Sequence, residues 1–146
     1  MRIVKADINH ISLIAPLLDQ YRIFYKQNSN VNAAKEFLEK RVLNNESIVF
    51  LAIDGNKPIG FVQLYPSFSS VSLQAIFILN DLYVATSHRG KKVGEQLLTR
   101  AMEYCREKEC KGLALETGID NPAKRLYERL GWKKDTDCFH YFWTLK

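Results

Sequence analysis

The chain has 146 residues, enough for one domain but too few for two well-packed cores. Hydrophobic residues make up 47% and charged residues 25%, which excludes an intrinsically disordered chain. The longest apolar run, 48–53, is far shorter than the roughly 20 residues that span a bilayer. Polar residues also interrupt the first apolar stretch, unlike in a signal peptide. We therefore expect one cytoplasmic domain, 1–146, without membrane contact.

The net charge of +5 fits either a protein with extra lysines or one with an anionic partner, such as a phosphorylated cofactor or a nucleic acid. The basic residues are scattered, so nucleic acid is not the expected partner. The cysteines are odd in number and form no CxxC, which predicts reduced thiols: Cys105, Cys110 and Cys138. The histidines have no ligand-type spacing, so no metal site is expected: His10, His88 and His140.

The first half of the chain predicts a strand, two helices and then a meander of strands. The strand covers 2–6 and the first helix 10–26, with an apolar stripe at helical spacing. A second helix begins at an Asn32 cap, and we expect four of its residues to be buried: Phe37, Leu38, Val42 and Leu43. A strand at 47–54 ends at the hairpin signal Asp54-Gly55, and its partner covers 58–65.

The second half predicts an alternation of strands and helices. A long strand covers 71–85, and a helix follows at 94–108 with five inward residues: Leu97, Leu98, Ala101, Tyr104 and Cys105. A strand at 112–117, a short helix at 122–130 and an aromatic strand at 138–145 complete the chain. This order predicts an α/β (α+β) fold with a mixed, mostly antiparallel central sheet flanked by helices.

A basic loop with two glycines precedes the helix at 94–108 and reads His88-Arg89-Gly90-Lys91-Lys92-Val93-Gly94. Cations are unfavourable at a helix N-terminus, and a bound anion would remove the conflict. The unpaired amides of such a terminus are donors for phosphate, and glycine lets the backbone approach a ligand closely. The alternative is a solvated basic turn. Neither GxxxxGK[ST] nor GxGxxG occurs, which argues against nucleoside triphosphatases and dinucleotide folds.

Two motifs together resemble the GNAT superfamily of acyl-CoA N-acyltransferases. The segment Asp81-Leu82-Tyr83-Val84, followed by the loop from Arg89 to Gly94, resembles the family's strand and its Arg/Gln-x-x-Gly-x-Gly/Ala coenzyme A loop. Asn121-Pro122-Ala123 and Leu126-Tyr127-Glu128-Arg129-Leu130-Gly131-Trp132 resemble its closing signature. The segment 63–70 is similar to a histone or polyamine acetyltransferase-like branch. The element order matches the family over essentially the whole chain.

The resemblance implies that acetyl-CoA is the co-substrate, that no metal takes part and that an amine receives the acetyl group directly in a ternary complex. It places the cofactor on the backbone of Leu82, Tyr83 and Val84 and on the loop Arg89, Gly90, Lys91, Lys92, Val93 and Gly94. Lys92 replaces the family's first glycine. The family asparagine, which contacts the pantetheine arm, corresponds to Asp120 or to Asn121, and either is also an N-cap candidate.

Tyr127 corresponds to the family tyrosine that protonates the leaving thiolate. The alternative is a core residue, because Tyr127 lies on an apolar stripe of its helix. Asp81 and Glu116 are acids in otherwise apolar strands, and either is a candidate base, with Asp81 preferred.

The acceptor pocket draws on residues that receive a cation or pack as an aromatic core: Tyr21, Tyr25, Tyr65, Asp81 and Glu116. The expected acceptor is a cationic amine, such as a polyamine, a lysine side chain or an amino sugar. A sensor of the same fold that binds coenzyme A without turnover is the alternative function. A homodimer and a monomer both stay open.

Overall fold

The computed structural model describes residues 1–145, and the chain folds as two units, 1–115 and 116–146. The first unit holds a five-stranded sheet in the order β1-β2-β3-β4-β5. All neighbouring strands are antiparallel except β4 and β5, which are parallel. The strands are β1 (Arg2–Lys5), β2 (Ile48–Asp54), β3 (Lys57–Ser69), β4 (Gln74–Val84) and β5 (Leu113–Ala114). The mixed, mostly antiparallel fold expected from the sequence is confirmed.

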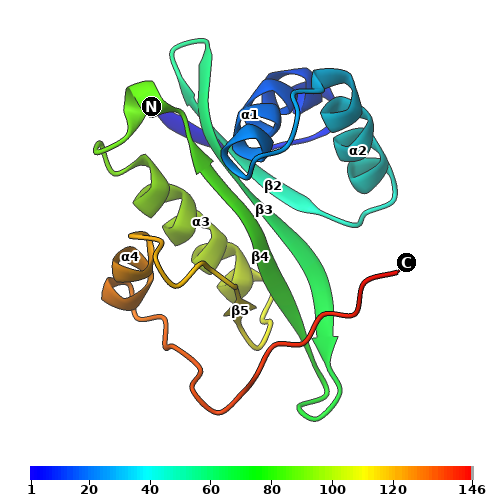
Figure 1. Cartoon of the computed structure of the whole chain (residues 1–146), viewed down its shortest axis with the longest axis vertical. Coiled ribbons are helices and arrows are strands. Elements are labelled where there is room, and N and C mark those ends of the chain that lie inside the picture. Colours follow the sequence, from blue (N-terminus) through cyan, green and yellow to red (C-terminus); the bar gives the residue numbers. More distant parts are fainter. Residues whose placement is uncertain (146) are drawn as a thin grey trace. The chain divides into compact units, whose positions relative to one another are not determined.

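Helices cover both faces of this sheet (Figure 1). One face carries α1 (Ile11–Phe24) and α2 (Val31–Leu43), and the other carries α3 (Val93–Glu107). Short 3-10 turns, η1 (Ile8–His10) and η2 (Thr86–His88), precede α1 and α3. The five inward residues expected in α3 are all buried, because its apolar stripe faces the sheet. No helix among residues 1–145 is long and apolar enough to cross a membrane.

The cap and the buried face of α2 differ from the sequence expectation. Asn30, not Asn32, caps α2, and its side chain accepts a hydrogen bond of 3.0 Å from the Ala33 amide. Leu38 is buried, but Phe37 and Leu43 are 42% and 68% exposed. α2 packs mainly against α1, so the apolar residues outside the stripe that faces α1 remain in solvent.

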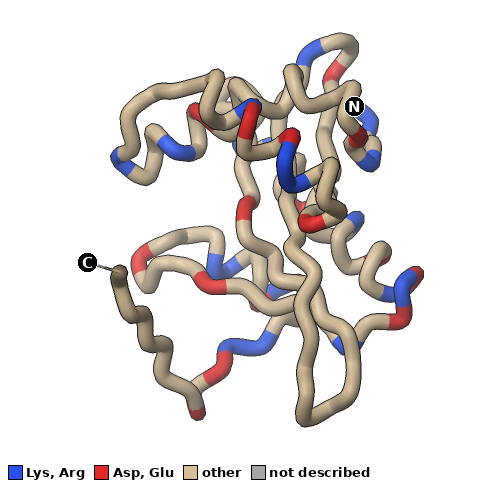
Figure 2. Tube along the Cα trace, turned by 90° about the vertical axis from the view of Figure 1, so that its right-hand side faces the viewer, with Lys and Arg blue, Asp and Glu red and all other residues tan. Residues whose placement is uncertain are grey.

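The β3–β4 hairpin is longer than the sequence pattern predicts. Its first strand was expected to end at residue 65, yet β3 continues to Ser69, and residues 60–69 pair with β4. Pairing of β3 with β2 ends at Leu64, so Pro66 lies where β3 has become an edge strand, a position at which proline is tolerated. From residue 58 to Val84 the hairpin carries a single charged side chain, Asp81, and Figure 2 shows its long uncharged arm.

The second unit, 116–146, contains one short helix, α4 (Lys124–Arg129), within its described residues. The strand expected at 138–145 is not formed. Its aromatic residues favour β structure, but a strand needs a partner, and the described part of this unit contains no other strand. The predicted strand at 112–117 is likewise shorter, since only Leu113 and Ala114 pair with β4.

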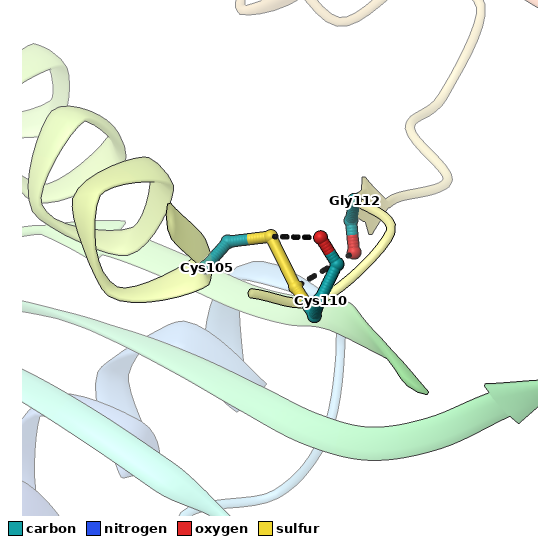
Figure 3. The surroundings of a disulfide bond; sticks show 3 residues. All are labelled: Cys105, Cys110 and Gly112. Carbon is teal, nitrogen blue, oxygen red and sulfur yellow. Dashed lines mark hydrogen bonds between the residues drawn. A yellow bond between two sulfur atoms is a disulfide. The ribbon is translucent and has the colours of Figure 1, made fainter. Parts of the chain in front are cut away.

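Cys105 and Cys110 form a disulfide, which corrects the expectation of reduced thiols (Figure 3). A tight turn after α3, with Glu109 in the left-handed region, brings their Cα atoms to 5.5 Å, within the usual range for a disulfide. Cys105 Sγ lies 3.8 Å from the Cys110 carbonyl oxygen, and Cys110 Sγ lies 3.6 Å from that of Gly112. Only free thiols donate hydrogen bonds, so reduction would leave each thiol with an acceptor already in place.

Candidate active site

A bulge in β4 gathers the polar residues of the first unit. Gln63 in β3 faces Asp81 in β4, but the next residue pair joins Leu64 to Leu79, so Asn80 is the extra residue. A bulge reorients the side chains beside it and bends the strand. The side chains of Gln63 and Asp81 lie in the largely apolar interior at this bulge, where they are 0% and 7% exposed.

The Asp81 carboxylate is held from both sides. The side-chain amide of Gln63 donates to Oδ2 at 2.7 Å, and that of Asn80 donates to Oδ1 at 3.1 Å. Burial raises the pKa of the Asp81 carboxyl above its ordinary value, and hydrogen bonds from Gln63, Asn80 and Tyr21 counteract part of this rise. A carboxylate with a raised pKa is a stronger base than an exposed aspartate.

Four residues of the first unit were expected in the acceptor pocket, and three of them lie close together: Tyr21, Tyr65 and Asp81. Tyr65 accepts a hydrogen bond of 3.2 Å from the Gln63 amide, and the Tyr21 hydroxyl lies 3.5 Å from the Asn80 carbonyl oxygen beside Asp81. Tyr25 packs edge-to-face on Tyr21, with ring centroids 5.0 Å apart, but is 52% exposed. Tyr25 therefore lies at the outer side of the cluster.

The hydroxyl groups of this cluster remain protonated at neutral pH. Burial, followed by the nearby Asp81 charge, raises the pKa of Tyr65 to about 12. The same two causes raise the pKa of Tyr21 well above its ordinary value. Both hydroxyls can therefore donate hydrogen bonds to a ligand over the pH range in which Asp81 changes its charge.

One edge of β4 is open next to this cluster. Within the first unit, β4 pairs with β3 as far as Val84, whereas β5 pairs with it only at Phe77 and Ile78. From Leu79 onward the β5-facing edge of β4 therefore offers backbone donors and acceptors without a strand partner. Leu82, Tyr83 and Val84, the residues expected to hold the cofactor arm, lie on this stretch.

The basic loop beyond β4 leads into the N-terminus of α3. Lys92 is the N-cap residue of α3 and adopts the left-handed conformation, with φ +63°. Gly90 also has a positive φ, +76°. Glycine adopts this conformation freely, whereas a residue with a side chain adopts it at a cost of roughly 1–2 kcal/mol. This cost explains why the family pattern has glycine at the position of Lys92. Lys92 adopts the same left-handed backbone conformation despite its side chain.

Arg89 and His88 anchor the same loop. The Arg89 side chain donates to the Val84 carbonyl oxygen at 3.1 Å and lies over the Tyr83 ring at 5.6 Å. His88 Nε2 lies 3.1 Å from Asp54 Oδ2 at the β2–β3 turn, and this hydrogen bond lowers the Asp54 pKa. These two contacts fix the loop just before α3. The first backbone amides of α3 have no acceptor within the helix and are therefore available to a ligand.

The second unit carries the other predicted site residues. Tyr127 is buried, 9% exposed, and its ring centroid lies 5.9 Å from that of Trp132. Neither Asp120 nor Asn121 is the N-cap of α4, which is Ala123 and makes no side-chain capping hydrogen bond, so that expectation is wrong. The Asn121 side chain instead accepts a hydrogen bond of 2.9 Å from the Ala123 amide in the turn before α4. The Glu116 side chain is 74% exposed and pairs with His140 at 2.9 Å, so the burial expected of a base is absent there.

Comparisons with known proteins identify the family. The sequence profile described as "Acetyltransferase (GNAT) family" matches residues 14–132. The chain belongs to the GNAT acetyltransferase family. The predicted family and the predicted enzyme class are therefore confirmed. Because the profile covers parts of both units, both contribute to the GNAT domain sequence.

Individual GNAT relatives agree with this assignment. An "Uncharacterized N-acetyltransferase YhfO" of Bacillus subtilis (strain 168) is 44% identical over 97% of this chain and 95% of its own length. A crystal structure of a "probable acetyltransferase" superposes with a TM-score of 0.94 at 40% identity, covering 100% of this chain and 99% of the other. An aminoglycoside N-acetyltransferase in complex with CoA has the same fold, with a TM-score of 0.81 at 18% identity over 99% and 95% of the two chains.

Sequence reasoning did not select Gln63 or Asn80 as site residues. Asn80 gains its place from the bulge, which the sequence pattern does not indicate. Gln63 carried a usable signal, because it is a polar residue within a continuous apolar run, 59–64, that is typical of a fully buried strand. Among residues 1–145, no group of three His, Cys, Asp or Glu side chains lies close enough together to hold a metal ion.

Proposed function

We propose that this GNAT protein transfers an acetyl group from acetyl-CoA to a primary, cationic amine in a ternary complex. The observation that carries the proposal is the buried Asp81 carboxylate at the bulge, next to the open edge of β4. The same edge and the loop at 89–94 offer backbone donors for an elongated, phosphorylated co-substrate. Coenzyme A bound to the aminoglycoside N-acetyltransferase of the same fold supports this choice.

Asp81 acts as the base in this mechanism. The acceptor arrives as an ammonium ion, because an alkylamine with a pKa near about 10.4 is mostly protonated at neutral pH. The buried carboxylate attracts this cation, and the rings of Tyr21 and Tyr65 add cation–π attraction. Asp81 takes one proton from the ammonium group, which leaves a neutral amine with a free electron pair.

The amine then attacks the thioester carbonyl, the new C–N bond forms, and the C–S bond breaks. Backbone amides on the open edge of β4 stabilise the oxyanion that develops on the carbonyl oxygen. Tyr127 gives its hydroxyl proton to the departing thiolate, and the second proton that the nitrogen loses as the amide forms restores the Tyr127 hydroxyl through solvent. With a thiol pKa of about 8.5, the thiolate makes only a modest demand on this acid. Asn121 contacts the pantetheine arm in this proposal, and residues 1–146 work as one acetyltransferase domain.

A panel of amines with acetyl-CoA tests the function, with release of free thiol as the signal. Turnover of polyamines, lysine peptides or amino sugars, and none of neutral or anionic amines, is the expected result. Tight binding of acetyl-CoA without turnover of any amine would instead favour the coenzyme A sensor. The polyamine-like branch and the cytoplasmic location stay predictions of the sequence, which leaves a homodimer and a monomer both open.

A further inference from the structure

The two N–H groups of the Gln63 side chain are both used at the site. Its Nε2 atom lies 2.7 Å from Asp81 Oδ2 and 3.2 Å from the Tyr65 hydroxyl oxygen. A primary amide has two N–H donors, so one points to each partner. Asp81 and Tyr65 are therefore both acceptors toward Gln63 in this arrangement.

The other end of the same amide has no hydrogen-bond partner. Gln63 Oε1 is buried, and no donor within the described residues reaches it. Buried polar atoms are nearly always paired, so an unpaired one calls for an explanation. Because Oε1 has no partner among the described residues, a half-turn of the nearly symmetrical amide breaks only the two hydrogen bonds that Nε2 donates. The turn exchanges those two for bonds that Oε1 accepts, and it moves the unpaired position from Oε1 to Nε2.

The preferred orientation of this amide depends on the charge of Asp81. A carboxylate only accepts hydrogen bonds, so it needs the Nε2 end of Gln63. A protonated Asp81 has an O–H to donate and needs an acceptor, which is the Oε1 end. The Tyr65 hydroxyl can accept or donate, so it has a partner in both orientations.

We propose that Gln63 is the positioning residue of the base, and that its amide donates to the Asp81 carboxylate before proton uptake and turns to accept from the Asp81 acid and from Tyr65 afterwards. The proposal rests on the proposed function, in which Asp81 is the base. One proton moves from the substrate ammonium to Asp81 Oδ2, leaving a neutral amine and a neutral acid, so no further reactant is needed. Each protonation state of Asp81 then keeps a partner.

Within the first unit, the other groups around Asp81 do not change charge in the same pH range. Asn80 is neutral, and Tyr21 of α1 and Tyr65 of β3 have raised pKa values, about 12 for Tyr65. Tyr25 of α1 adjoins Tyr21. Arg41 of α2 is the cationic group whose charge acts on Tyr65. A signal from Gln63 that titrates in the acidic to neutral range therefore reports Asp81.

Side-chain NMR of the full-length free protein tests the inference without any turnover. We expect the Gln63 side-chain amide signals to shift with the same midpoint as the Asp81 carboxyl carbon. In Asp81→Asn the Gln63 signals should no longer titrate. Gln63 signals that stay constant while the Asp81 carboxyl titrates would overturn the proposal, and this outcome needs no variant that folds.

Kinetics separate this inference from the proposed function. Gln63→Leu removes the donor that lowers the Asp81 pKa, and Gln63→Glu puts a second carboxyl group beside Asp81, whose charge raises the Asp81 pKa. In both variants the acidic limb of the kcat/KM profile should therefore move to higher pH. Plateau kcat should fall roughly tenfold or more, the rate equivalent of a hydrogen bond to a charged group. Gln74→Leu, at the exposed start of β4, is the matched control and should change neither. Unchanged turnover in Asp81→Asn would refute the base itself, whereas an unmoved limb in both Gln63 variants would refute only the role of Gln63.

Discussion

Gly60 in β3 lies directly against the main-chain carbonyl of Tyr83 in β4. A methyl group at Gly60 would stand 2.8 Å from the Tyr83 oxygen and 3.3 Å from a Leu97 methyl group. The first contact is with backbone, which can move only by shifting β4. The stretch of β4 proposed to hold acetyl-CoA is thus positioned by a residue on the neighbouring strand.

Gly60→Ala should destabilise the protein and weaken the binding of acetyl-CoA. Overpacking of this kind typically costs 1–3 kcal/mol, so we expect a loss of about 2 kcal/mol in the free energy of unfolding. Denaturant unfolding and calorimetric titration measure the two effects. Gly112→Ala is the matched control, because nothing lies within 4 Å of the added methyl group. Equal stability of the two variants would contradict the close contact.

Lys92→Gly should stabilise the protein, because glycine relieves the left-handed conformation at φ +63°. We expect a gain of about 1 kcal/mol in the free energy of unfolding. Binding of acetyl-CoA then reveals the role of the side chain. If the Lys92 ammonium meets a phosphate, affinity falls and its salt dependence flattens. Lys91→Gly in the same loop serves as the comparison for loss of a charge. A destabilised Lys92→Gly variant would contradict the conformational argument.

Asp81→Asn should raise stability at neutral pH while it lowers activity. Burial raises the Asp81 pKa above 3.8, so between the two values the folded state binds more protons than the unfolded state. This contribution is fully present below the unfolded pKa and is lost as the pH rises through the folded pKa. Asp81→Asn has no carboxyl group at this position, so its free energy of unfolding should not fall in this way as the pH rises. Unfolding measured from pH 4 to pH 8 in both proteins checks it, and parallel curves would contradict a raised pKa.

The Cys105–Cys110 disulfide should contribute little more than local stability. It closes a loop of only six residues (105–110), for which the chain-entropy account gives about 2 kcal/mol. Mass spectrometry after alkylation should find one reactive thiol, the exposed Cys138, before reduction and three afterwards. Reduction should lower the melting temperature without unfolding the protein, because each freed thiol has a carbonyl acceptor. Three alkylated cysteines without reductant would restore the original expectation of reduced thiols.

The fold could be predicted from the sequence wherever one face of an element meets the core. The helical stripe of α3 is of this kind, the apolar run of β2 marks a strand that is buried on both faces, and both elements form close to the predicted ranges. The segment 138–145 shows the limit of this reasoning. Its aromatic residues favour a strand, but whether a strand forms depends on an available edge, which is a property of the tertiary structure.

The candidate site was predictable only in part for a similar reason. Asp81 was recognisable as an acid within an apolar strand. Its partners depend on the bulge at Asn80, which shifts the register by one residue and leaves no trace in the periodic pattern. The disulfide was missed because the spacing of five between Cys105 and Cys110 has no standard interpretation, and the turn that closes it depends on a left-handed Glu109.

Tyr127→Phe tests the mechanism rather than the binding. Phenylalanine keeps the ring that packs at 5.9 Å from Trp132 and removes only the hydroxyl. If Tyr127 is the general acid, acetyl-CoA should bind almost unchanged while kcat falls roughly 10²-fold, the lower end of what a positioned acid supplies. That factor corresponds to about 2.7 kcal/mol of transition-state stabilisation.

The leaving thiol distinguishes an acid from a structural role for Tyr127. An acetyl donor with a more acidic thiol needs less help from an acid, so the deficit of Tyr127→Phe should shrink with such a donor. Trp132→Phe is the matched control, because it alters the same ring contact and spares the hydroxyl, and its kcat should not depend on the donor in this way. If Tyr127→Phe instead lowers the melting temperature and keeps kcat within a few-fold of wild type, Tyr127 is a core residue. Solvent would then protonate the thiolate, which is feasible because a thiol pKa of about 8.5 leaves a stable leaving group near neutral pH.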